Sequence, residues 1–110
     1  MAVFRFLYQP VSDLDVASRF YTKGLGFVEA WRDGDLSAGL QMPGAECQMM
    51  LSKSGKPAGP MYLVENLDQW TTEHPDAEVV VERDAAGSGE VVGFKDPDGN
   101  VFYIFDQPPG

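Results

Sequence analysis

The sequence contains few of the residues on which disulfide and metal chemistry depend. Its 110 residues include one cysteine, Cys47, and one histidine, His74. A single cysteine cannot form an intramolecular disulfide, which fits a reducing compartment. Cys47 lies in an apolar run, so we expect an inert thiol. A single histidine excludes a two-histidine, one-carboxylate iron site within one chain, and the following Pro75 favours a capping or exposed role for His74 at a helix end.

Basic residues are also scarce. The chain has 8 Lys and Arg against 17 Asp and Glu, which gives a formal net charge of −9. This charge repels phosphate backbones, so no nucleic acid partner is expected. It favours solubility first and a cationic ligand second. No apolar run approaches the roughly 18 residues of a membrane span, and the N-terminus lacks a signal-peptide pattern. We therefore expect a cytoplasmic protein without a membrane partner.

The hydrophobic pattern predicts the order strand, helix, strand, strand, strand twice along the chain. The first set is expected at residues 3–8, 14–23, 27–31, 36–41 and 47–51, and the second at 61–64, 67–73, 78–82, 90–94 and 101–105. Residues 84–89 are expected to form a loop. A linker rich in Gly, Pro, Lys and Ser spans residues 52–60. The prediction is one α+β domain, 1–110, with βαβββ modules at 1–54 and 60–107.

Three segments carry a resemblance to a known family. They are Val11–Leu14 (VSDL), Phe20–Phe27 (FYTKGLGF) and Phe94–Asn100 (FKDPDGN). In this order and at this separation they resemble the vicinal oxygen chelate superfamily, which includes glyoxalase I, bleomycin resistance proteins and extradiol dioxygenases. The resemblance covers nearly the whole chain. It implies two βαβββ modules that form a curved, mostly antiparallel, cup-shaped sheet, and it makes a homodimer the expected assembly.

The same resemblance identifies the positions where metal-dependent members carry their ligands. In this sequence they are Phe6, Met50, Gly59 and Tyr103. Divalent metals prefer imidazole, carboxylate or amide oxygen, and these residues offer none of them. We therefore predict no metal and no cofactor, and enzymatic activity is not favoured.

Strand alternation supplies candidates for a binding site instead. If Phe6 and Tyr103 point into the cup, its lining is apolar and aromatic. Such a lining suits a flat or apolar molecule, because aromatic rings stack and Met adapts its shape. The predicted ligand-binding residues are Phe6, Tyr8, Trp31, Met50, Met61, Tyr103 and Phe105. An equal alternative is that these side chains fill the cup as core.

Three functions are therefore open at the level of sequence. The first is metal-independent binding of a small apolar or aromatic molecule, as in a drug-sequestering resistance protein, with the acidic surface attracting cations. The second is a glyoxalase-like lyase or isomerase with an atypical metal site. The third is a dimeric interaction module whose cup is filled.

Overall fold

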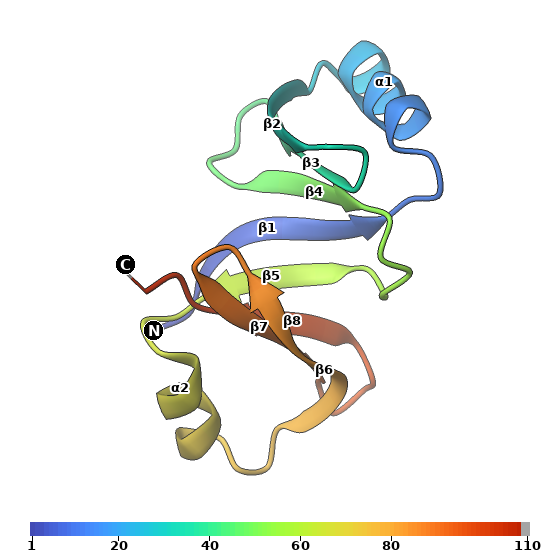
Figure 1. Cartoon of the computed structure of the whole chain (residues 1–110). Helices are drawn as coiled ribbons and strands as arrows, with labels where there is room; N and C mark the ends of the chain where they lie inside the picture. Colours follow the sequence, from blue (N-terminus) through green and yellow to red (C-terminus); the bar gives the residue numbers. More distant parts are fainter. Residues whose placement is uncertain (109–110) are drawn as a thin grey trace. The chain divides into compact units, whose positions relative to one another are not determined.

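The computed structural model describes residues 1–108, in which two helices and eight strands form two compact units (Figure 1). The first unit is Arg5–Ala58. The second unit joins Met1–Phe4 to the described residues from Gly59 to Pro108. No helix within residues 1–108 has the length and apolar character needed to cross a membrane.

The first unit is one βαβββ module. Its strands lie in the order β2-β3-β4-β1, with antiparallel pairs except between β4 and β1, which run parallel. The elements are β1 (Val3–Pro10, of which residues from Arg5 belong to this unit), α1 (Leu14–Leu25), β2 (Val28–Asp33), β3 (Ser37–Gln41) and β4 (Gln48–Ser52). The helix lies against one face of this sheet (Figure 1).

The second unit repeats the arrangement. Its strands lie in the order β5-β8-β7-β6, and again only the first and last strands of the module, β5 and β8, run parallel. The elements are β5 (Gly59–Leu63), α2 (Leu67–Glu73), β6 (Glu78–Ala86), β7 (Gly89–Lys95) and β8 (Val101–Phe105). The predicted α+β class, the two βαβββ modules and their mostly antiparallel pairing are therefore confirmed.

The prediction of a loop at residues 84–89 is wrong. β6 continues to Ala86, and β7 begins at Gly89, so the turn between them is short. Asp84, Ala85 and Ala86 pair with Val91, Glu90 and Gly89. The small and polar residues have weak strand preference, but pairing with β7 overrides it, and two register shifts absorb the irregularity.

Each unit buries its core between its helix and one face of its sheet. The first core consists of Leu14, Ala38, Leu40, Met49 and Leu51. The second consists of Val64, Leu67, Val92, Phe94 and Ile104. Strand side chains alternate between faces, so the residues between these core positions belong to the opposite face of each sheet. That opposite face is where the sequence places the candidate site.

Both helices begin with a side-chain cap at the same place in the repeat. The Asp13 carboxylate accepts a hydrogen bond from the Val16 N–H at 3.0 Å, and the Asn66 side chain accepts one from the Gln69 N–H at 2.9 Å. These bonds satisfy N–H groups that the first helical turn leaves without partners. The equivalence of the two caps supports an internal repeat. His74 is the C-cap of α2, as its predicted capping role requires.

Loss of either cap should weaken the fold by a measurable amount. We expect Asp13→Ala and Asn66→Ala each to lower the free energy of unfolding by about 1 kcal/mol. The measurement is urea unfolding followed by circular dichroism. Ser12→Ala is the control, because Ser12 precedes the cap and should change stability by less than about 0.5 kcal/mol. An equal loss in the Ser12 variant would contradict the assignment of Asp13 as the cap.

Candidate functional site

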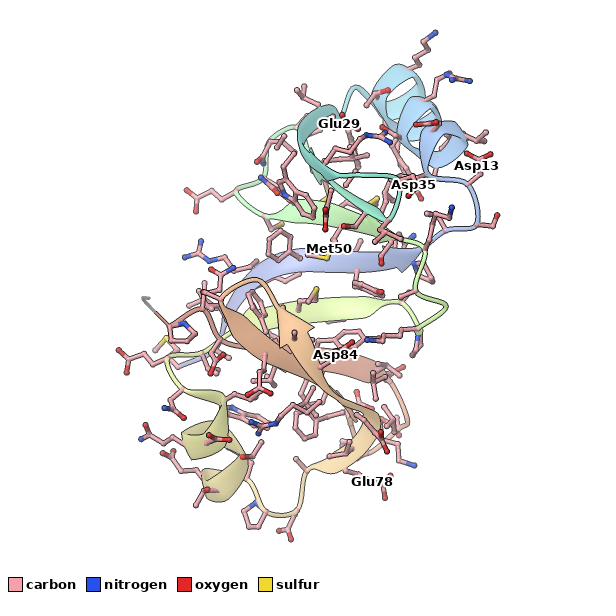
Figure 2. All side chains as sticks on the ribbon, in the orientation of Figure 1. Asp13, Glu29, Asp35, Met50, Glu78 and Asp84 are labelled. Atoms are coloured by element: carbon pink, nitrogen blue, oxygen red, sulfur yellow. The ribbon has the colours of Figure 1, made fainter. Side chains whose placement is uncertain are left out.

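One row of paired residues crosses the first unit on the face away from α1. Trp31 on β2 pairs with Gly39 on β3, Gly39 pairs with Met50 on β4, and Met50 pairs with Tyr8 on β1. Directly paired residues point to the same side of a sheet. Trp31, Met50 and Tyr8 therefore form one band across four strands, which we call the aromatic row; Met50 is labelled on β4 in Figure 2.

The indole of Trp31 lies over the backbone of Gly39. A Cβ at position 39 would lie far inside van der Waals contact with Nε1 and Cε2 of that ring, so only glycine leaves room for it. The indole N–H donates to Oε1 of Gln48 at 2.9 Å. The hydrogen bond fixes the rotation of the ring, and the glycine sets its depth. The ring is thus held in one orientation before any ligand arrives.

The adjacent row on the same face, two residues before Tyr8 on β1 and Met50 on β4, contains both apolar and polar side chains. Phe6 pairs with Gln48, and Gln48 pairs with Gln41. The amide nitrogen of Gln41 donates to the carbonyl oxygens of Ala45 at 2.6 Å and Cys47 at 3.2 Å, which closes the loop between β3 and β4. Polar amides therefore border the aromatic row on this side.

Hydroxyl groups border the aromatic row on the opposite side. Ser37 pairs with Ser52 in the row beyond it. The Tyr8 hydroxyl is hydrogen-bonded to the hydroxyl of Ser54. The polar ends of Trp31 and Tyr8 are thus satisfied inside the unit, and the surface they present is ring and thioether carbon.

The second unit has an equivalent row with a different character. Met61 pairs with Tyr103, Tyr103 pairs with Gly93, and Gly93 pairs with Val81. Tyr103 and Met61 are only 3% and 5% exposed, and Phe105, two residues beyond Tyr103, is 3% exposed. A Cβ at Gly93 would lie 2.6 Å from Cβ of Val81, so the small residue is again required by close packing.

The structure divides the seven predicted site residues into two groups. Phe6, Trp31 and Met50 of the first unit are half-buried, and Tyr8 beside them is buried. The other three, Met61, Tyr103 and Phe105, come together in the second unit and are buried there. The accessible part of the predicted set is therefore on the first unit.

Sequence reasoning missed two residues that shape this face. Gln48 orients the indole and Gly39 receives it. Gln48 could have been found by alternation alone, because it lies two residues before Met50 on the same strand. Gly39 could not, because its role depends on how β2 pairs with β3.

Comparison with known protein families identifies the family of the chain. The sequence profile of the Glyoxalase/Bleomycin resistance protein/Dioxygenase superfamily matches residues 4–104. The chain belongs to this superfamily. No curated protein matches the sequence.

Solved structures of the same fold include members with different activities. A methylmalonyl-CoA epimerase from Mycobacterium tuberculosis has a TM-score of 0.71 at 20% identity, over 97% of this chain and 89% of its own. A structure described as an NAD-dependent benzaldehyde dehydrogenase from Legionella pneumophila has a TM-score of 0.75 at 13% identity, over 93% of this chain and 97% of its own. A glyoxalase/bleomycin resistance protein/dioxygenase superfamily member from Vibrio splendidus 12B01 has a TM-score of 0.61 at 19% identity, over 96% of this chain and 97% of its own. At these identities the likeness concerns the fold alone.

The positions that the resemblance assigns to metal ligands do not fit a metal in this chain. Phe6 and Met50 offer no hard donor, and Tyr103 offers only a phenol on a buried side chain. At Gly59 a Cβ would lie 2.5 Å from the carbonyl oxygen of Val101, so no ligating side chain fits there. Within residues 1–108, no group of three or more His, Cys, Asp or Glu side chains could hold a metal ion.

Proposed function

We propose that the first unit binds a small, flat, apolar or aromatic molecule on the face of its sheet that α1 leaves uncovered, without a metal ion. The observation that carries this proposal is the aromatic row, in which Trp31 is held over Gly39 by Gln48 and lies beside Met50 and Tyr8. A preset ring offers stacking at a small entropic cost, and the Met thioether adapts to the shape of its neighbour.

The borders of the row narrow the ligand further. Amide groups lie on one side of it and serine hydroxyls on the other. A ring with hydrogen-bonding groups at its edge suits this order better than a wholly aliphatic molecule, since apolar sites gain orientation from a few polar groups. Drug sequestration, as in the bleomycin resistance branch of the superfamily, is one use of such a site.

The two tryptophans of the chain make the proposal testable at one site. Trp31 belongs to the aromatic row, and Trp70 lies on α2 of the second unit. In a Trp70→Phe protein, Trp31 is the only tryptophan. We expect 2-naphthol to quench its emission saturably, and Phe6→Ala and Met50→Ala each to weaken that binding about tenfold, which is about 1.4 kcal/mol.

Phe20→Ala is the matched control for this titration. Phe20 is 66% exposed on α1, in the same unit but away from the aromatic row, so its removal should leave the affinity unchanged. Linear, unsaturable quenching would refute the proposal, as would an equal loss of affinity in the Phe20 variant. Circular dichroism melts of each variant separate a lost contact from a lost fold.

A further inference from the structure

The second unit contains an open hollow that the proposed site does not use. Its volume is about 760 Å³, and it lies between the C-terminal end of α2, the start of β6 and the turn between β7 and β8. The lengths of the two helices explain it. α1 has 12 residues, whereas α2 has 7 and ends at Glu73 before His74 and Pro75. The shorter helix leaves one end of its sheet without helical cover.

The inner wall of the hollow is aromatic. Trp70 and His74 stack with ring centroids 4.1 Å apart and an interplanar angle of 17°, and Phe102 completes this wall. Trp70 also packs against Phe94 at 5.1 Å, which ties the wall to the core of the unit. Its rings are therefore fixed from behind. A ligand in the hollow would meet ring carbon on its apolar side.

One hydrogen bond sets the state of the His74 ring. Its Nδ1 lies 2.7 Å from the carbonyl oxygen of Trp70. A carbonyl oxygen only accepts, so Nδ1 carries the proton of this bond. In the neutral ring the other nitrogen, Nε2, is then an acceptor. The wall thus combines aromatic rings with one ring nitrogen, Nε2, that can accept a hydrogen bond from a ligand.

The rim of the hollow is acidic. Four carboxylates line it, against one lysine: Glu73, Asp76, Glu78, Asp96 and Lys95. Lys95 Nζ lies 2.6 Å from Oε2 of Glu78, so its charge is already matched; Glu78 is labelled at the start of β6 in Figure 2. The remaining three carboxylates leave the rim with net negative charge.

The charged form of the Asp96 carboxyl is stabilised by hydrogen bonds. Its carboxylate accepts hydrogen bonds from the backbone N–H of Asn100 at 2.8 Å and from the side-chain amide of Asn100 at 3.0 Å. These bonds, with smaller contributions from the backbone of Asp98 and Gly99, hold the pKa of this carboxyl below its usual range. Asp96 therefore contributes a negative charge to the rim at neutral pH.

From the aromatic wall and acidic rim together, we propose that this hollow binds an organic ammonium cation with an apolar or aromatic body. The body lies against Trp70 and Phe102, and the ammonium group lies toward Glu73 and Asp76. An anion of the same shape would meet like charge and should be excluded. This site is separate from the aromatic row and does not depend on it.

The test uses Trp70 as the only tryptophan, in a Trp31→Phe protein. The probes are benzylamine, benzyl alcohol and benzoate, which share one ring and differ in charge. We expect benzylamine to change Trp70 emission saturably, with an affinity at least tenfold above that of benzyl alcohol and with no saturable effect of benzoate. Raising the salt from 50 to 500 mM should weaken benzylamine several-fold.

A second readout and a matched pair of variants make the result decisive. His74 is the single histidine of the chain, so its Cε1–H proton gives one assignable resonance, which benzylamine should shift in the unsubstituted protein. Glu73→Gln with Asp76→Asn should weaken binding at least fivefold. Asp35→Asn with Glu46→Gln removes the same charge from the first unit and should change the affinity less than twofold.

Two outcomes would overturn the inference. One is equal affinity for all three probes, or no saturable effect of benzylamine up to 10 mM on either reporter. The other is an equal loss of benzylamine affinity in the two double variants, which would show that the overall charge of the chain, and not the rim of the hollow, attracts the cation. Because Trp31 reports on the aromatic row and Trp70 on the hollow, failure of one proposal leaves the other measurable.

Discussion

Gly39→Ala should weaken aromatic binding in the first unit at least tenfold and destabilise the protein. The added Cβ would overlap the indole of Trp31, so the ring must leave its place and its hydrogen bond to Gln48 must break. Overpacking of this kind costs about 1–3 kcal/mol. In the Trp70→Phe background, we expect the affinity for 2-naphthol to fall at least tenfold and the urea midpoint to fall with it.

Gly24→Ala is the control that separates crowding from a general effect of glycine replacement. Gly24 lies inside α1 and has no positive φ, and beyond the helix's own backbone no atom lies within 4 Å of the place that its Cβ would take. Alanine there should raise stability by about 0.5–1 kcal/mol, because glycine is the weaker helix former. The two substitutions are chemically identical and should act in opposite directions.

A double variant keeps the prediction falsifiable if Gly39→Ala unfolds. Trp31→Ala removes the ring that the new methyl group would meet, so Gly39→Ala should cost little stability in that background. The coupling between the two changes should be at least about 1 kcal/mol. Additive losses would show that Gly39 is required for a reason other than the indole, and would remove the physical basis for a preset ring.

The helix boundaries illustrate how far sequence patterns reach. Ser12 and Asp13 are both good candidate caps by residue type, and the structure assigns the cap to Asp13. The predicted end of this helix at residue 23 is wrong by two residues, because the helix continues through Leu25 and its C-cap is Gly26, with φ of 74°. A left-handed end favours glycine, but a sequence with two nearby glycines does not say which of them adopts it.

From the sequence, only the residues that share a face within one strand of the candidate site could be predicted, and not how the strands pair. Alternation places Tyr103 and Phe105 on one face of β8, since one residue separates them. The row Trp31–Gly39–Met50–Tyr8 depends on pairing between strands, and a register shift between Glu29 and Trp31 changes that pairing in β2. A bulge of this kind leaves no reliable mark in one sequence. The homodimer stays a prediction.

Burial also separates residues that the sequence treats as equals. Phe6 and Tyr103 are both metal-ligand positions in the resemblance, yet one is half-buried and the other is 3% exposed. The surroundings decide this difference, since Tyr103 has Met61 and Gly93 as direct neighbours and Val81 filling the space beside Gly93. Composition shows which residues can line a site; packing decides which of them remain accessible.

Asp106→Ala should be the most destabilising polar substitution proposed for this chain. One carboxylate oxygen accepts from the Leu67 N–H at 2.8 Å and the other accepts from the Glu90 N–H at 3.0 Å. The Asp106 N–H also donates to the Glu90 carbonyl at 3.1 Å. A single side chain thus joins the first turn of α2, the start of β7 and the end of β8. The hollow in the second unit depends on the position of α2.

Hydrogen bonds to a charged group contribute about 1.5–3 kcal/mol each, so the loss of two should cost about 3 kcal/mol once water replaces part of them. Urea unfolding of Asp106→Ala is the measurement. Asp98→Ala, in the exposed turn, is the control and should change stability by less than about 0.5 kcal/mol. Asp106→Asn keeps one acceptor oxygen and should lose about half as much as Asp106→Ala. Equal losses in the Asn and Ala variants would show that charge, rather than the two directed bonds, holds α2 to β7.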